Sequence, residues 1–325
     1  MGKLKVIYDT DPGVDDAMAL LLLARHPEVE LLGVTTVFGN ATIETTTRNA
    51  LVLKQRFGLS CPVAQGASKG INGEASDPPT FVHGDNGLGN IELPSLRSKV
   101  DPRPATQLII ELVRANPHEV TIIAVGRMTN LAEAMAIDPG IVPLVKAVVV
   151  MGGAFGRNGH TGNVTPVAEA NIIGDAGAAD IVFGAAWPMT IVGLDVTQQT
   201  VMTTAYMAEL RDRAGVDGQF IWDISRFYSE FYSGTGQTRD GFYVHDSSAV
   251  AYALHPEFFT VERGPVRVVV GGIANGQTIL RPEKRFDHAA DWDGRPSCNV
   301  CVGVDSDAFL KFYRDTLVAT PAGAD

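Results

Sequence analysis

The sequence is poor in the features that mark secreted, membrane-spanning or nucleic-acid-binding proteins. Three cysteines in 325 residues, an odd number, argue against a disulfide framework. The apolar run at residues 17–24 is far too short to span a bilayer, and no signal-peptide pattern opens the chain. Lysine and arginine number 26 against 37 acidic residues, and a formal net charge of −11 disfavours wrapping a nucleic acid backbone. We therefore expect a cytoplasmic protein with neither a membrane nor a nucleic acid partner.

Short apolar segments and longer amphipathic ones alternate along the first two thirds of the chain. With 45% hydrophobic residues, the protein can bury a substantial core. The alternation from residue 4 to about 214 predicts an α/β fold, an open and mainly parallel doubly wound sheet flanked by helices, in a single domain spanning residues 1–325. The expected strands are 4–9, 29–40, 62–64, 120–126, 147–151, 189–197, 266–270, 277–280 and 299–304, and the expected helices begin near residues 17, 42, 105, 176, 216, 244 and 306.

Four carboxylates follow the first expected strand within eight positions: Asp9, Asp11, Asp15 and Asp16. Pro12 and Gly13 lie between them, and an apolar helical run comes next. One carboxylate at a helix start needs no explanation beyond favouring the positive end of that helix. Four are too many for capping, and they repel one another unless a cation holds them. The cluster therefore indicates a metal site.

Ligands in open α/β sheets bind beyond the carboxyl ends of the strands, and polar residues gather at those positions here. The irregular, glycine-rich stretch 66–94 also indicates a binding loop. Apart from Met151 and the carbonyl of Val125, the residues at strand ends and in the loops after them are acidic, amide or imidazole, with no lysine or arginine among them. Such a set suits a hard cation and a neutral hydroxylated ligand rather than a phosphate. Its members are Asp9, Asp11, Asp15, Asp16, Asn40, His83, the carbonyl of Val125, Met151, Asn163, Glu169, Asn171, Asp195, His245 and Asp246.

The motif DTDPGVDDAMAL, which begins at Asp9, resembles the signature of the inosine–uridine-type nucleoside hydrolases. VTTVFGN, FVHGDNGLG, MGGAFG, GNVTPVAEANI and VHDSSAVAYAL follow in that family's order and extend the resemblance over roughly the whole chain. It implies an N-ribohydrolase that cleaves the bond between ribose and a nucleobase and holds a calcium ion tightly. It also implies a homodimer or homotetramer with a nucleoside substrate.

Carried over residue by residue, the resemblance gives most of the strand-end residues a role. It implies that Asp11 is the general base acting on the attacking water and that His245 is the acid for the leaving base. Ala170 departs from the family, because several members carry Phe there, and Val125 replaces a common Thr whose backbone oxygen alone coordinates. The implied calcium ligands are Asp11, Asp16, Asp246 and the carbonyl of Val125; the implied substrate-binding residues are Asp15, Asn40, Asn163, Glu169 and Asn171, with Met151 lining the pocket and His83 on the base side.

Two further groups of residues have less specific patterns. An aromatic-rich helix and a nearby tyrosine supply candidates for a lid over the base: Phe227, Tyr228, Phe231, Tyr232 and Tyr243. Core packing is the commoner role at helical spacing, and we expect it for two of the four on the helix. Cys298 and Cys301 lie on an expected strand without a second pair, so we interpret them as structural. Asp9 is expected to support the acidic loop.

Three alternatives to a broad inosine/uridine-type nucleoside hydrolase stay open. The first is a pyrimidine-specific ribonucleoside hydrolase, because the two histidines on the base side resemble those members as well. The second is a haloacid-dehalogenase-like phosphatase, in which Asp9 and Asp11 would be nucleophile and acid with magnesium; it leaves Asp15 and Asp16 unexplained. The third is a calcium-dependent sugar-binding protein without catalysis, which would have no need of a base at Asp11.

Overall fold

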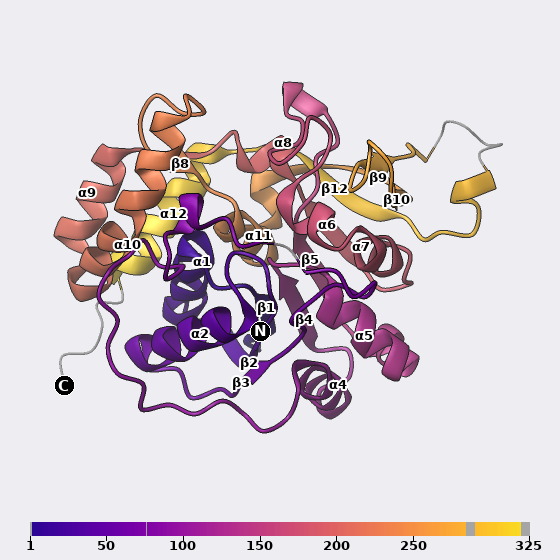
Figure 1. Ribbon diagram of the computed structural model, residues 1–325, viewed down its shortest axis with the longest axis horizontal. Helices are drawn as coiled ribbons and strands as arrows, with labels where there is room; N and C mark the ends of the chain where they lie inside the picture. Colours follow the sequence, from indigo (N-terminus) through magenta and orange to yellow (C-terminus); the bar gives the residue numbers. More distant parts are fainter. Residues whose placement is uncertain (1, 76, 284–289, 320–325) are drawn as a thin grey trace.

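An eight-stranded sheet organises the computed structural model, which describes residues 2–75, 77–283 and 290–319 (Figure 1). Its strand order is β3-β2-β1-β4-β5-β6-β12-β9, and every neighbouring pair is parallel except β12 and β9. The predicted mainly parallel α/β fold is therefore confirmed. The strands are β1 (Leu4–Thr10), β2 (Val29–Thr36), β3 (Val63–Gln65), β4 (Val120–Ala124), β5 (Ala147–Met151), β6 (Met189–Val192), β9 (Phe259–Gly264) and β12 (Cys298–Val304), with the smaller pairs β7 (Val201–Met202) with β8 (Phe242–Tyr243) and β10 (Val266–Val268) with β11 (Thr278–Leu280).

Helices cover both faces of this sheet (Figure 1). Alternation along β1 divides the core, because Val6 and Tyr8 pack in one apolar cluster and Ile7 in the other. Among the described helices, none combines the length and the apolar character needed to cross a membrane. The helices are α1 (Val14–Arg25), α2 (Ile43–Phe57), α3 (Thr80–His83), α4 (Ala105–Ala115), α5 (Thr129–Ile137), α6 (Ala170–Gly174), α7 (Ala176–Phe183), α8 (Leu194–Thr197), α9 (Thr204–Arg213), α10 (Gly215–Gly234), α11 (Asp246–Leu254) and α12 (Ser306–Ala319).

Strand β1 is the point where the direction of winding reverses. The chain runs from β1 outward through β2 to β3, and then returns to the other side of β1 for β4, β5 and β6. The connections diverge there, so a crevice opens beyond the carboxyl ends of β1 and β4. Asp11 follows β1 and Val125 follows β4, which places both at this crevice.

One predicted strand is wrong in part, and one strand of the main sheet was not predicted. The strand expected at 189–197 ends at Val192, and α8 follows it from Leu194. Gly193 begins this helix, and Asp195 lies within it rather than at a strand end. The antiparallel edge strand β9 has mostly half-buried or exposed residues, so its sequence gives little sign of a strand.

The long helix α10 is fastened to α1 by a buried ion pair. The Arg25 guanidinium, at the end of α1, donates to both carboxylate oxygens of Asp217 at 2.6 and 3.1 Å. The Asp217 side chain is 2% exposed and that of Arg25 11%. Since the N-terminus of α1 carries Asp15 and Asp16, this pair sets the position of α10 relative to the acidic cluster.

We predict that Asp217→Ala destabilises the fold by about 3–5 kcal/mol, because it leaves the Arg25 charge buried without its main partner. Asp212→Ala is the matched control, since Asp212 forms an exposed pair with Arg211 and should change stability by less than about 0.5 kcal/mol. Urea unfolding of both variants measures the difference. Equal losses would show that the buried pair does not hold α10 in place.

Candidate active site

Asp16 is fixed by donors from three segments. Its Oδ1 accepts from Thr10 Oγ1 at 2.5 Å, and its Oδ2 accepts from the Gly13 amide and from Asn40 Nδ2, each at 2.9 Å. The Gly13 bond caps helix α1. Asp16 therefore does cap its helix, as the simpler interpretation of the cluster expected, but it also joins the end of β1 to the loop after β2.

Asp11 lies between two glycines that leave no room for other side chains. A Cβ on Gly39 would collide with its Oδ2, and a Cβ on Gly126 would come within 2.8 Å of its Oδ1. The Asn40 amide donates to Oδ2 at 2.8 Å, whereas the buried Oδ1 has no hydrogen-bond partner among the described residues. One carboxylate oxygen is thus held and the other is left for a ligand.

Asp246 opens helix α11 and brings a carboxylate from far along the chain to the cluster. Single oxygens of Asp15, Asp16 and Asp246 lie within 4.8 Å of one another. Asp11, which the sequence placed among the metal ligands, is outside this triad, although its amide donates to Asp16 Oδ1 at 3.3 Å. Asp15, placed on the sugar, is inside it, and its buried Oδ1 lacks a partner among the described residues.

Burial dominates the electrostatics of the cluster. It raises the pKa of Asp15 to about 6, and it raises the pKa values of Asp11, Asp16 and Asp246. Repulsion among neighbouring carboxylates raises the last three further. Burial also raises the pKa of Asp9 to about 7, against hydrogen bonds from Thr35 and Asn130. Such a group holds its charges at neutral pH only with a counter-ion.

The donors present fit calcium. All of the available ligand atoms are oxygens, and the cluster carries excess negative charge. Two of its buried carboxylate oxygens, Asp11 Oδ1 and Asp15 Oδ1, have no hydrogen-bond partner among the described residues. Calcium accepts several carboxylates together with a backbone carbonyl. The carbonyl of Val125 lies at the same crevice, where it accepts from Asn171 Nδ2 at 2.7 Å.

A cavity of about 290 Å³ lies above the cluster. One wall comes from the N-terminus of α6, where Glu169 accepts from the amides of Asn171, Ile172 and Gly153 at 2.9–3.2 Å. The side-chain amide of Asn171 donates to the carbonyls of Val125 and Met151, which leaves its oxygen as an acceptor. The predicted residues that line the cavity are Asp15, Asn40, His83, Val125, Met151, Asn163, Glu169, Asn171, Tyr228, Phe231, Tyr232, His245 and Asp246.

A chain of hydrogen bonds crosses the opposite wall. Thr197 Oγ1 and Tyr232 Oη each lie 2.8 Å from a ring nitrogen of His245. Tyr228 Oη lies 3.4 Å from Tyr232 Oη and donates to Asp15 Oδ2 at 3.3 Å. Burial lowers the pKa of His245 to about 4, so the imidazole of the protein without ligands is neutral near pH 7.

Three of the five predicted lid residues line the cavity. They are Tyr228, Phe231 and Tyr232, all on α10. Phe227 and Tyr243 are not among the described lining residues. Phe227 lies on α10 one turn before Phe231, and Tyr243 packs against Tyr232 with their ring centroids 5.5 Å apart.

Three groups outside the cavity have structural roles. The Asp195 carboxylate accepts from the amides of Phe155 and Arg157 and so holds the loop after β5. Asp9, which was expected to support the acidic loop, instead joins the end of β1 to β2 and α5, because it accepts from Thr35 and Asn130. Cys298 and Cys301 are buried and free on opposite faces of the sheet, which supports their structural interpretation.

The sequence did not indicate two residues near the site. Thr197 was assigned to a strand, so its bond to His245 was not foreseen. Arg127 is buried within reach of the charge of Asp11, and it was not among the candidate site residues. It is not among the described lining residues, so the wall of the cavity still lacks a phosphate-binding cation. Nothing in the motif VGRMTN indicates that this arginine turns inward.

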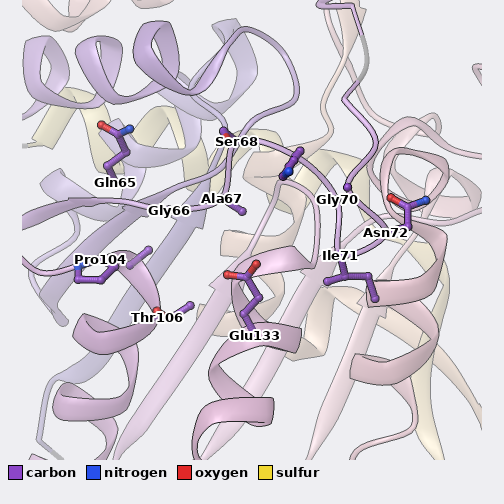
Figure 2. A pocket seen from close by; sticks show the side chains of 13 residues that line it. Gln65, Gly66, Ala67, Ser68, Gly70, Ile71, Asn72, Pro104, Thr106 and Glu133 are labelled. Carbon is purple, nitrogen blue, oxygen red and sulfur yellow. The ribbon is translucent and has the colours of Figure 1, made fainter.

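A larger hollow of about 580 Å³ lies apart from these residues, between the loop after β3 and the first turn of α4 (Figure 2). Its wall includes Glu133 on α5, whose carboxylate points toward the segment 66–70. None of the predicted site residues is among its described lining residues. Size alone would select this hollow, but the titratable cluster and the strand ends select the smaller one.

Known proteins are similar to this chain in both sequence and fold. Residues 6–311 match the sequence model of the family described as inosine-uridine preferring nucleoside hydrolase. The chain belongs to this family. It is 40% identical to a probable uridine nucleosidase 1 of Oryza sativa, with 97% of each chain covered, and 40% identical to an inosine-uridine preferring nucleoside hydrolase of Leishmania major, with 85% of this chain and 87% of the other covered. A solved plant nucleoside hydrolase superposes with a TM-score of 0.92 at 36% identity and covers 97% of this chain and 99% of its own.

Membership establishes the reaction class. The protein is a nucleoside hydrolase, an N-ribohydrolase that cleaves the bond between ribose and a nucleobase. The phosphatase hypothesis is therefore wrong. The acidic cluster at the switch point of the sheet is consistent with this reaction, and so is the cavity wall, which has no lysine or arginine among the described lining residues.

We predict that Gly39→Ala lowers kcat/KM for nucleosides about 100-fold, because the new methyl group displaces the Asp11 carboxylate from its place between the two loops. The displaced carboxylate can rotate, so the melting temperature should change little. Gly234→Ala is the control, since a Cβ there meets nothing within 4 Å. Full activity of Gly39→Ala would refute the placement of Asp11.

Proposed function

We propose that this nucleoside hydrolase is calcium-dependent and acts broadly on purine and pyrimidine ribonucleosides, in the manner of the inosine/uridine type. The observation that carries the proposal is the cluster of buried carboxylates at the switch point, which has excess negative charge and oxygens without partners among the described residues. Asp11, Asp16, Asp246 and the carbonyl of Val125 would hold the ion. Asp15, although part of the compact triad, would turn to the ribose.

Asp11 is the general base in this proposal. The Asn40 amide holds its Oδ2, and the buried Oδ1 has no hydrogen-bond partner among the described residues, so it is available to accept a proton. A water that attacks the anomeric carbon gives its proton to this carboxylate. When bound, calcium would lower the pKa of a water in its coordination shell and orient two ribose hydroxyls.

The part of the cavity wall that lies away from the nucleobase binds the ribose. Asn163, Glu169 and Asn171 offer carbonyl and carboxylate oxygens together with amide donors, and Asn40 and Asp15 face them across the cavity. Cleavage of a glycosidic bond passes through a ribosyl cation, which such oxygens stabilise. A lysine or arginine in the wall would oppose that charge.

His245 is the candidate proton donor for the leaving base. Hydroxyl groups of Thr197 and Tyr232 lie 2.8 Å from its two ring nitrogens and hold the ring in place. Because burial lowers the pKa of His245 to about 4, the imidazole must first take up a proton from solvent, and it then donates that proton to the leaving base. His83 lies on the same side of the cavity, against Tyr228, with their ring centroids 5.3 Å apart. We propose that Tyr228, Phe231 and Tyr232 cover the base.

The broad specificity rests on the relatives and on the wall around the base. The named relatives include a uridine nucleosidase and an inosine-uridine preferring hydrolase. Aromatic and imidazole rings, which stack on any nucleobase, form the base side. The pyrimidine-specific alternative would require a restriction in this wall that excludes the larger purine ring.

The remaining expectations for the chain are part of the same proposal. We infer a single domain, because β1 and β12, which lie at opposite ends of the chain, belong to the same eight-stranded sheet. We further propose a cytoplasmic homodimer or homotetramer that salvages or degrades nucleosides and binds no nucleic acid, in keeping with the net charge of −11.

The decisive experiment is release of free base and ribose from uridine, cytidine, inosine and adenosine, before and after chelation with EDTA. We expect turnover of all four, loss of at least about 100-fold on chelation and recovery with added calcium. Turnover of uridine and cytidine alone would favour the pyrimidine-specific alternative. Unchanged rates in EDTA would refute the proposed calcium dependence. Absence of turnover would favour a non-catalytic sugar-binding protein.

We predict that His245→Ala lowers kcat for natural nucleosides by about 100-fold or more. It should lower kcat for p-nitrophenyl riboside much less, because that leaving group needs no proton. Thr197→Val, which removes the hydroxyl at Nδ1, should give the same pattern in weaker form. Equal losses on both substrates would reject His245 as the acid.

A further inference from the structure

Arg127 is unusual in this protein because its charge is buried. Among residues 2–75, 77–283 and 290–319, it is the single lysine or arginine that is buried, with 7% of its surface exposed. Charged side chains are seldom buried unless other groups compensate for the lost hydration. The carboxylates whose charges act on it are those of Asp11, Asp175 and Glu169.

The Arg127 side chain packs between the two sides of the proposed ribose site. It follows β4 directly, two residues after the proposed calcium ligand Val125. Its guanidinium lies 4.2 Å from the centroid of the Phe38 ring, in the loop that carries Asn40. Its other side packs against Gly174 at the end of α6, where a Cβ would collide with the guanidinium.

The charge of Arg127 acts on both of those sides. Gly126, its neighbour in the chain, lies against Asp11, because a Cβ on Gly126 would come within 2.8 Å of Asp11 Oδ1. The charge of Arg127 lowers the pKa of Glu169, against the rise caused by burial. Asp175, the cap of α7, is its third carboxylate neighbour. Since Arg127 is not among the described residues lining the cavity, it affects the reaction only through these groups.

We propose that Arg127 is a positioning residue that supplies a built-in counter-charge to the acidic cluster, stabilising the metal-free protein and weakening its affinity for calcium. A fixed positive charge near Asp11 offsets part of the repulsion between carboxylates when no cation is bound. The same charge repels a divalent cation that arrives at those carboxylates. Both effects follow from one interaction, so they must change together.

This inference rests on the proposed calcium site, and charge can be separated from packing by substitution. Arg127→Met keeps much of the apolar volume and removes the charge. Arg127→Gln removes the charge and keeps hydrogen-bond donors. Arg127→Lys is the matched control, because it keeps the charge in the same place. The readouts are the calcium Kd, from titration of the metal alone, and the melting temperature in EDTA and in saturating calcium.

We expect Arg127→Met and Arg127→Gln to bind calcium about tenfold more tightly than the wild type. Their melting temperatures should fall in EDTA and recover in calcium by more than the wild type gains. Arg127→Lys should stay within about twofold of the wild-type Kd, well below that tenfold change. If Arg127→Met fails to fold without metal, Arg127→Gln gives the same comparison.

An unchanged or weaker calcium Kd in both uncharged variants would overturn the inference, and so would an equal change in Arg127→Lys. Those results would show that the side chain acts by packing alone. Failure of the proposed calcium site gives a different result, because the wild type itself would then show no calcium-dependent heat and no rise in melting temperature.

Discussion

The structure depends on burying several carboxylates together at the end of one strand. Removing such charges from water is costly, and their mutual repulsion adds to the cost. The chain meets it with fixed donors: Thr10 and the amide of Gly13 on Asp16, and the amide of Asn40 on Asp11. These donors leave carboxylate oxygens without partners among the described residues, which is the condition a divalent cation satisfies.

The topology supplies what the first motif cannot. Because winding reverses at β1, the loops after β1, β2 and β4 converge on Asp11. Helix α11, packed against α1, adds Asp246 from more than two hundred residues away. The Arg25–Asp217 pair sets α10, with its tyrosines, over the same point. The acidic turn, the ribose wall and the aromatic cover thus come from separate segments held by one sheet.

Much of this was readable from the sequence, because the central elements have strong patterns. The expected strand 147–151 and the helices beginning at 105 and 176 match β5, α4 and α7 in their bounds or start. The segment 193–197 was predicted as strand because Val196 and Thr197 are β-branched. Leu194–Thr197 nevertheless forms a helix, beside the loop that the Asp195 carboxylate holds. Strand β9 was missed because an exposed edge carries little apolar signal. The inward turn of Arg127 depends on tertiary contacts that local sequence does not encode.

The division of labour among the aspartates is the central claim, and the sequence and the geometry differ on it. The sequence resemblance puts Asp11 on the metal and Asp15 on the sugar, whereas the compact triad contains Asp15 in place of Asp11. A crystal structure with bound calcium and a ribose-like inhibitor decides between them. We expect one ion, about 2.3–2.6 Å from oxygens of Asp11, Asp16, Asp246 and Val125, with Asp15 on a ribose hydroxyl. An ion held by Asp15, Asp16 and Asp246, with Asp11 outside its coordination shell, would contradict the account.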